Sequence, residues 1–191
     1  MIVMTESNKK DCRAKLARIR ETLAPAYFDA ANAQIQKRVF EFEPFCNARN
    51  TFIYMATSHE PQTWELIRKA LSEGKGVYVP VCDSATEMSA VRISSKTLFS
   101  PNRFGIREPV GATEIMGPAH FDLAIIPCVS ADLQGGRLGH GAGYYDRFLC
   151  QTKAAKLCLC FDALLSNTIP MDPFDVPMDY IITESKTVSC C

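Results

Sequence analysis

Apolar residues recur at helical spacing near the start of the chain, between residues 8 and 23. They fall at positions i, i+4, i+7 and i+11, so the predicted helix has one apolar face and a largely basic remainder. On the basic side, Lys9 and Arg13 lie one turn apart and could converge on one phosphate. A solvated charged face explains the same pattern. The apolar residues are Cys12, Leu16, Ile19 and Leu23.

The same periodicity predicts two more helices, one from Pro25 to about Phe42 and one from Thr63 to Glu73. Gly74 follows the latter and ends it. Short apolar runs between and after these helices predict buried strands. The runs are 51–56, 76–82, 88–93, 122–128, 156–161 and 180–183. Because strands and helices alternate, we expect one α/β domain over residues 1–191, with a largely parallel sheet.

Between Lys96 and His120 the periodicity fades. Prolines and glycines interrupt this segment repeatedly. We therefore predict a long loop with one helical turn at most, and loops of this length are usually functional or mobile.

The densest cluster of unusual residues runs from Gly135 to Arg147. Five of the ten glycines fall in its first nine residues. A predicted strand precedes the cluster, and a predicted helix over about 144–152 follows it. Glycine lets a ligand approach the backbone, while loop amides and a helix N-terminus together favour an anion. The ionisable residues of the cluster include Arg137, His140, Asp146 and Arg147.

Two common phosphate-binding motifs do not match this cluster. A Walker A loop would require Gly-Lys-Ser/Thr, which is missing, and a dinucleotide fingerprint would require a glycine where Tyr144 stands. A tight loop whose glycines serve only steric needs is the alternative interpretation.

Composition narrows the function classes. Apolar residues make up 47% of the chain, and the 21 basic residues balance 21 acidic ones, which argues against a general nucleic-acid binder. No apolar run approaches the length of a membrane span. Residues 1–11 do not form a signal peptide. The nine cysteines are scattered without a CxxC pair, so we expect free thiols, no zinc site and a cytoplasmic location.

The spelling Arg-Leu-Gly-x-Gly-x-Gly-Tyr-Tyr-Asp-Arg over residues 137–147 resembles the signature of the 5-formyltetrahydrofolate cyclo-ligases, also called methenyltetrahydrofolate synthetases. A second block, residues 175–184, is similar to the C-terminal segment of that family. The resemblance extends from about residue 8 to 184. It implies a three-layer α/β/α fold of the sugar-isomerase and CoA-transferase (NagB/RpiA-like) type.

The resemblance implies an enzyme that uses ATP and Mg²⁺ to turn 5-formyltetrahydrofolate into 5,10-methenyltetrahydrofolate, ADP and phosphate. Phosphorylation makes the formamide oxygen a good leaving group, and N10 then attacks the activated carbon. Phosphoryl transfer asks the protein mainly for positioning and charge neutralisation. The expected partner is this small molecule, with one or several glutamates on its tail, rather than nucleic acid or membrane. We expect a monomer.

The family's roles transfer to named positions by resemblance. The ATP-binding residues are Lys9, Arg13, Arg137, Leu138, Gly139, His140, Gly141, Ala142, Gly143, Tyr144 and Tyr145. The substrate-binding residues are Met55, Glu60, His140, Gly141, Ala142, Gly143 and Tyr144. The catalytic residues are Arg137, His140 and Tyr145, and the magnesium ligands are Asp146 and Asp179. Alone, Glu60 is equally explained as an acid at a helix start, and Asp179 as a cap at a strand entry.

Several positions depart from the family's pattern. The usually acidic position two after Glu60 is Gln62, and the frequent His-Asp pair before the last strand is Phe174-Asp175. The glycine motif carries His140 and Ala142 at its variable positions, and Ala163 stands in a segment that is often aromatic-Glu-x-Gln. These changes motivate a second hypothesis, a non-catalytic relative that binds folate or nucleotide. A third, a phosphosugar-binding regulator, would need a DNA-binding module for which the chain leaves no room.

Overall fold

A computed structural model describes residue 2 and residues 8–102, 105–111 and 114–190. The α-helices are α1 Lys9–Glu21, α2 Pro25–Phe40, α3 Glu43–Asn47, α4 Trp64–Ser72 and α5 Tyr144–Leu149, and the 3₁₀ turns are η1 Pro118–His120 and η2 Asp162–Leu164. The strands are β1 Asn50–Ile53, β2 Gly76–Cys82, β3 Met88–Ile93, β4 Leu98–Pro101, β5 Arg107–Val110, β6 Ile115–Met116, β7 Leu123–Ile126, β8 Ser130–Ala131, β9 Arg137–Leu138, β10 Ala155–Leu159, β11 Tyr180–Ile182 and β12 Thr187–Ser189.

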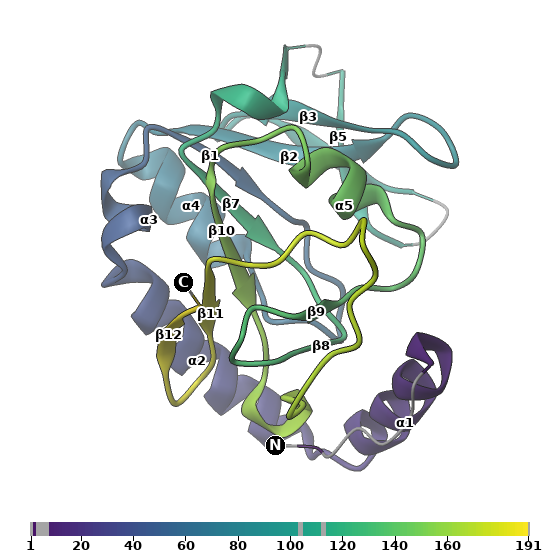
Figure 1. The fold of residues 1–191 in the computed structure, drawn as a ribbon. Coiled ribbons are helices and arrows are strands. Elements are labelled where there is room, and N and C mark those ends of the chain that lie inside the picture. The colour runs from purple at the N-terminus through teal and green to yellow at the C-terminus, as the bar shows by residue number, and fades with distance from the viewer. Residues whose placement is uncertain (1, 3–7, 103–104, 112–113, 191) are drawn as a thin grey trace.

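The centre of the molecule is an eight-stranded sheet in the order β12-β11-β10-β7-β1-β2-β3-β6. The five strands from β11 to β2 are parallel, and antiparallel strands flank them on both edges. In Figure 1, α2, α3 and α4 lie on one side of this sheet and α5 on the other, while α1 stands apart from the other helices. The chain is thus mixed α/β with a mainly parallel sheet, as the alternation of elements predicts.

An aromatic cluster fixes α5 against the sheet. The rings of Phe52 on β1 and Phe148 on α5 are stacked with centroids 4.5 Å apart, and Phe121 lies 5.8 Å from Phe52. All three side chains are buried. Burying each of these rings contributes about 1.5–3 kcal/mol to the free energy of folding. The helix that follows the glycine loop is therefore held in place against the sheet.

The strand order has a switch point between β1 and β7. From β1 the chain builds outward through β2 and β3, then returns to β7 and builds in the other direction through β10 and β11. Open α/β sheets bind ligands at such a point, beyond the carboxyl ends of the strands. Residues 54–63 follow β1 and residues 127–143 follow β7, so both segments meet there.

The predicted long loop over Lys96–His120 is wrong in part. The segment contains the β4–β5 hairpin and the edge strand β6, and the predicted helical turn corresponds to η1. Pro101 and Pro109 sit in the two-stranded β4–β5 ribbon, where a missing backbone N–H costs little because an edge strand leaves one side unpaired.

Smaller elements also escaped the prediction. The helix α3, the strand β12 and the β8–β9 hairpin are too short to show periodicity. In addition, Arg137 and Leu138 form strand β9 instead of the loop expected there, and α5 ends at Leu149. The remaining predicted helices and strands are confirmed, with shifts of a few residues at their ends.

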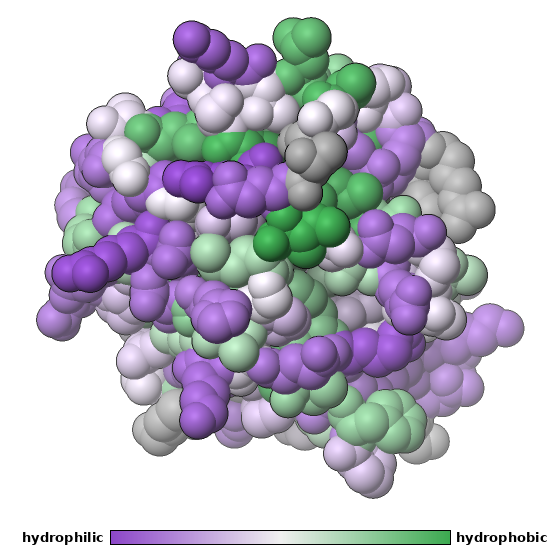
Figure 2. Space-filling view, turned by 90° about the horizontal axis from the view of Figure 1, so that it is seen from above, coloured by the Kyte–Doolittle hydropathy of each residue, from purple (hydrophilic) through white to green (hydrophobic). Residues whose placement is uncertain are grey.

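Within the described ranges, no helix combines the length and apolarity needed to cross a membrane, and no disulfide joins the cysteines. The face that carries β3 and β5, seen from above in Figure 2, shows hydrophobic patches among hydrophilic side chains. The exposed large apolar side chains of the β4–β6 region are Leu98, Val110 and Ile115.

Candidate active site

Two cavities adjoin each other at the switch point of the sheet. The cationic cavity has a volume of about 330 Å³ and is lined by Lys9, Arg13, Arg137, residues 139–146 and Asp172, among others. The apolar cavity, about 310 Å³, is lined by Met55, Thr57 and Glu60, by apolar side chains of β2 and β3, and by Asn102 and Glu108, among others. The two share a wall formed by Pro127, His140, Ala142, Tyr144 and Tyr145. Ligands in the two cavities would therefore lie next to each other along these five residues.

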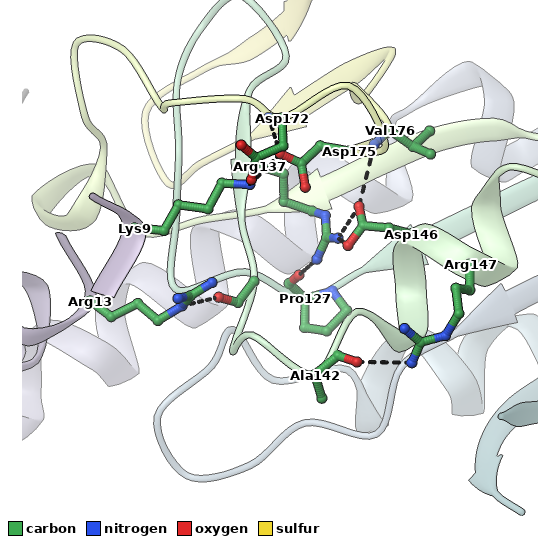
Figure 3. Close-up of polar contacts among 11 residues, drawn as sticks. Lys9, Arg13, Pro127, Arg137, Ala142, Asp146, Arg147, Asp172, Asp175 and Val176 are labelled. Carbon is green, nitrogen blue, oxygen red and sulfur yellow. Dashed lines mark hydrogen bonds and ion pairs between the residues drawn. The ribbon is translucent and has the colours of Figure 1, made fainter. Parts of the chain in front are cut away.

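A buried ion pair forms the base of the cationic cavity. The Nη2 atom of Arg137 lies 2.8 Å from both carboxylate oxygens of Asp146, and Nη1 donates to the carbonyl of Pro127 at 3.3 Å (Figure 3). Arg137 is only 5% exposed. Its Nε–H, also buried, has no hydrogen-bond partner within the described residues. The pair thus leaves the Nε–H donor of the guanidinium without a partner among the described residues.

Helix α1 brings two further cations to this cavity. Its apolar face is buried through Cys12 and Leu16, as the sequence pattern predicts. From the other face, Arg13 Nε donates to the carbonyl of Gly139 at 2.7 Å, and Lys9 pairs with Asp172 at 2.7 Å and with Asp175 (Figure 3). The structure thus brings Lys9 and Arg13 to the cationic cavity, where Arg13 bonds to the glycine loop itself.

The absence of side chains at three glycines makes room for arginines. A Cβ at Gly139 would lie 2.8 Å from Nη1 of Arg137, and one at Gly143 would lie 2.7 Å from Nη1 of Arg147. Gly141, at φ +104°, has the guanidinium of Arg13 beside it. Three positive groups can therefore lie against the loop backbone.

The first two glycines of the cluster serve the fold. A Cβ on Gly135 would meet the carbonyl oxygen of Met178 at 2.5 Å, and one on Gly136 would meet the carboxylate of Asp132 at 2.3 Å. That buried carboxylate accepts hydrogen bonds from the amides of Gln134, Gly136 and Ile169. For this part of the cluster, the steric interpretation is sufficient.

A carboxylate held by neutral donors marks the apolar cavity. Glu60 is 6% exposed, and its Oε2 accepts from the backbone N–H and the hydroxyl of Thr57 at 2.8 and 2.9 Å. Its Oε1 lies 3.8 Å from Nε2 of the exposed His140. The second oxygen is therefore oriented toward the shared wall and can accept a hydrogen bond from a ligand.

Tyr145 lies in the wall between the two cavities. Burial raises the pKa of its hydroxyl, and the nearby charge of Glu60 raises that pKa further, while Arg137 lowers it in part. The hydroxyl therefore stays protonated at neutral pH and is a hydrogen-bond donor to either cavity. The neighbouring Tyr144 donates to the carbonyl of Ser84 at 2.8 Å, which ties the wall to the turn after β2.

The two aspartates predicted to bind magnesium lie in separate ion pairs. Asp146 lines the cationic cavity, where Val176 N also donates to it at 3.3 Å. Asp179 accepts from the backbone N–H and the Nζ of Lys156 at 2.8 and 2.7 Å. Asp179 precedes β11 at the amino ends of the parallel strands, whereas both cavities lie beyond the carboxyl ends. No group of three or more potential metal-ligating side chains occurs within the ranges that the structure describes.

Most of the other predicted residues line the cavities. Met55 and Glu60 line the apolar one, Gly141 and Gly143 line the cationic one, and His140, Ala142, Tyr144 and Tyr145 line both. Leu138 is the exception, because its side chain is fully buried in the core.

Sequence reasoning missed Thr57 and Asp172. The spacing of Thr57 and Glu60, a hydroxyl three residues before a carboxylate, resembles a capping box and could have indicated the pair. Asp172 gave no comparable signal, because its partner Lys9 is 163 residues away.

Comparisons with known proteins agree with one another. A family model described as the 5-formyltetrahydrofolate cyclo-ligase family matches residues 5–184. A Schizosaccharomyces pombe protein named "Probable 5-formyltetrahydrofolate cyclo-ligase" is 31% identical and covers 94% of this chain and 97% of its own length. The Escherichia coli K12 5-formyltetrahydrofolate cyclo-ligase is 28% identical, with coverages of 87% and 95%. The solved structure of Aquifex aeolicus 5,10-methenyltetrahydrofolate synthetase aligns with a TM-score of 0.85 at 27% identity, covering 95% of this chain and 92% of that one.

Proposed function

Because the chain belongs to the 5-formyltetrahydrofolate cyclo-ligase family, we propose that it converts 5-formyltetrahydrofolate and ATP into 5,10-methenyltetrahydrofolate, ADP and phosphate. The observation that carries the proposal is the pair of adjoining cavities, one cationic and one apolar with a buried carboxylate. Transfer between two substrates requires that their reacting atoms meet at about 3–3.5 Å. Two cavities that border on the same five residues are adjacent, and this is the arrangement that permits such an approach.

In this proposal the pterin ring occupies the apolar cavity. Ring N–H groups donate to the free oxygen of Glu60, and Met55 packs against the ring face. The N5-formyl group then points to the shared wall, where His140 and the protonated hydroxyl of Tyr145 can orient it.

The triphosphate occupies the cationic cavity, against Lys9, Arg13 and Arg137. The formyl oxygen attacks the γ-phosphorus, the bond to ADP breaks, and the resulting iminium phosphate, still bonded to N5, is attacked at carbon by N10. A carbon–nitrogen bond forms as the carbon–oxygen bond to phosphate breaks, and N10 loses its proton. The cations neutralise charge on the transferred group throughout.

For Mg²⁺, Asp146 fits as a hard oxygen ligand beside the phosphates, since such ions are usually held by one or two carboxylates together with phosphate oxygens. Bound there, the ion would supply charge neutralisation on the phosphates. Asp179 fits less well, because Lys156 holds its carboxylate at the opposite edge of the sheet.

The decisive experiment is an ultraviolet assay for methenyltetrahydrofolate with ATP and Mg²⁺, and with each omitted in turn. Product should form only in the complete mixture. A protein that binds 5-formyltetrahydrofolate and ATP but yields no product would support the non-catalytic alternative. That alternative is motivated by the departures from the family pattern at Gln62, Ala163 and Phe174.

We further propose a cytoplasmic monomer with the three-layer fold of the sugar-isomerase and CoA-transferase (NagB/RpiA-like) type. Light scattering on the eluting peak of a gel-filtration column would test the monomer. A mass twice the 21.2 kDa of the chain would contradict it.

A further inference from the structure

A second carboxylate, that of Glu108 on β5, lines the apolar cavity from the side of the β4–β5 hairpin. Strand β5 lies against β2 (Figure 1), and Oε1 of Glu108 accepts from the backbone N–H of Cys82, the last residue of β2, at 3.2 Å. The same oxygen accepts from Nδ2 of Asn102 at 2.9 Å. Two neutral donors therefore hold this carboxylate at the surface of the cavity.

The other oxygen of Glu108 is available to a ligand. Within the described ranges, Oε2 makes no hydrogen bond, and no cationic side chain forms an ion pair with Glu108. The residue is half-buried. A carboxylate that is partly withdrawn from water and has no cation beside it is a strong acceptor for the N–H groups of a ligand.

The contacts of Glu108 repeat the arrangement found at Glu60. In both cases a backbone N–H and a side-chain donor hold one carboxylate oxygen and leave the other free. The free oxygen of Glu60 lies 3.8 Å from Nε2 of His140, which belongs to the shared wall. By contrast, Glu108 and its partners Asn102 and Cys82 border the apolar cavity and not the cationic one. The two acceptors therefore stand on different sides of one cavity.

The head group of a tetrahydrofolate has more donors than one carboxylate oxygen can serve. Its 2-amino group, N3 and N8 all carry N–H bonds, and these lie on different edges of the fused ring. The free oxygen of Glu60 has only two lone pairs and stands at one edge. A donor that loses its water without finding an acceptor weakens binding. An acceptor on another side of the cavity removes this penalty.

We propose that Glu108 is a second residue that binds the head group, and that its Oε2 accepts from ring N–H donors that Glu60 does not reach. This inference rests on the proposed function and adds a specificity residue to the same site. With acceptors on two sides, the cavity selects a ring that carries N–H donors on two edges and disfavours one that presents a lone pair there.

The first test removes the acceptor with little change in shape. In Glu108→Gln the single amide oxygen stays with the donors of Asn102 and Cys82, so the NH₂ group faces the cavity and opposes a ring N–H. The KM for 5-formyltetrahydrofolate should rise about tenfold, with the KM for ATP and the melting temperature unchanged. Glu87→Gln, at an exposed glutamate of the turn between β2 and β3, is the matched control and should leave both KM values unchanged.

Two substrate analogues distinguish a direct contact from a structural role. The 8-deaza analogue of 5-formyltetrahydrofolate lacks the N8–H donor, and the 2-desamino-2-methyl analogue lacks the amino group. At least one of these deletions should raise the KM of the wild type about tenfold and that of Glu108→Gln less than about twofold, because the variant has already lost the acceptor. A substitution that only loosened the hairpin would leave both enzymes with the same response to each analogue.

The outcomes separate this inference from the proposed function. Turnover with equal responses to both analogues in wild type and Glu108→Gln overturns the assignment of Glu108 and leaves the proposed function intact. A raised KM for ATP in the variant overturns the assignment too, since Glu108 does not border the cationic cavity. If no product forms, the proposed function fails, and calorimetry with 5-formyltetrahydrofolate alone then measures head-group binding. About tenfold weaker binding to Glu108→Gln supports the inference, whereas equal affinities or no binding overturn it.

Discussion

The cationic and apolar cavities share a wall, yet different interactions hold their functional groups. In the cationic cavity, Lys9 and Arg137 are engaged by aspartates. In the apolar cavity, Glu60 is held by two neutral donors of Thr57 and keeps one oxygen for a ligand. A phosphate must therefore join or displace existing ion pairs, whereas a ring N–H finds an acceptor already in place. Substitutions should affect the first cavity through charge balance and the second through local geometry.

The largest effect is expected from Arg137→Ala. The substitution leaves Asp146 without its partner, which for a buried pair costs about 3 kcal/mol of folding free energy. It should also lower kcat/KM by at least a hundredfold, because an oxyanion-stabilising donor is lost. The double variant Arg137→Met/Asp146→Leu should recover much of the stability but none of the activity. Denaturant melts and the ultraviolet assay measure the two effects, and an active double variant would exclude the pair from catalysis.

Asp146→Asn sharpens the comparison by changing charge with little change in shape. The amide oxygen can still accept from Arg137, while a hard ligand for Mg²⁺ is lost, so turnover should fall by about two orders of magnitude. Excess Mg²⁺ should restore part of the loss. Asp179→Asn serves as the matched control, and near-normal activity of Asp146→Asn at limiting Mg²⁺ would refute the metal assignment.

Glu60→Gln tests the apolar cavity. Glutamine keeps an acceptor for Thr57, so the melting temperature should change little, but a neutral oxygen holds ring N–H groups less strongly. We expect kcat/KM for the folate to fall about tenfold, with the KM for ATP unchanged. Glu65→Gln, on the exposed side of α4, is the control. An equal rise in both KM values would show that the cavities are not independent.

Gly139→Ala should have a moderate effect on the cationic cavity. Its Cβ would lie 2.8 Å from the guanidinium of Arg137, so that buried group must shift. Displacement of a positioning group by a few tenths of an ångström should lower turnover by about tenfold. Gly117→Ala, whose nearest neighbour would be 3.7 Å away, is the control. Gly141 is less informative, since at φ +104° any side chain also strains the backbone.

The smallest effect is expected from the ion pairs of Lys9. Burial lowers the pKa of Lys9, but the ion pairs with Asp172 and Asp175 outweigh it, so the pKa is raised. A raised pKa gives stability that is complete below the ordinary lysine value of about 10.4 and is lost as the pH rises through the folded value. The free energies of unfolding of wild type and Lys9→Met, measured by denaturant titration, should therefore differ by a constant amount, under about 1 kcal/mol, from pH 6 to 9. A difference that disappears within this range would contradict the assignment.

How far the sequence predicts the site depends on how its residues are spaced. The strand β7, the glycine loop and the helix α5 follow one another within residues 123–149, so local patterns predict them and the motif identifies their charges. Lys9 and Arg13 are one helical turn apart, so the sequence predicts that they share a face of α1, and the family resemblance assigns that face to ATP. The pairing of Lys9 with Asp172 is a product of tertiary packing alone and leaves no local pattern.

The same limit explains the weaker predictions. Segment 96–120 reads as a loop because its hairpin strands are short and contain prolines, which local propensity counts against a strand. A further cavity, of about 910 Å³, is lined by Arg20 from α1 and Arg107 from this hairpin, so no motif could contain both. Asp179 is the opposite case. Its sequence block resembles the family's and predicts a site residue, but it lies at the amino ends of the parallel strands, away from both cavities.

The attachment of α1 has a consequence for the response of the protein to heat. This helix lies outside the central sheet. Its apolar face packs through Cys12 and Leu16, and its polar face joins the glycine loop and the C-terminal segment through Arg13 and Lys9. Elements with few packed contacts open at lower free energy than the core. As temperature rises, detachment of α1 would remove two cations from the cationic cavity while the sheet stays folded. Inactivation should therefore precede the loss of tertiary structure, and a nucleotide that bridges α1 and the loop should bring the two temperatures together.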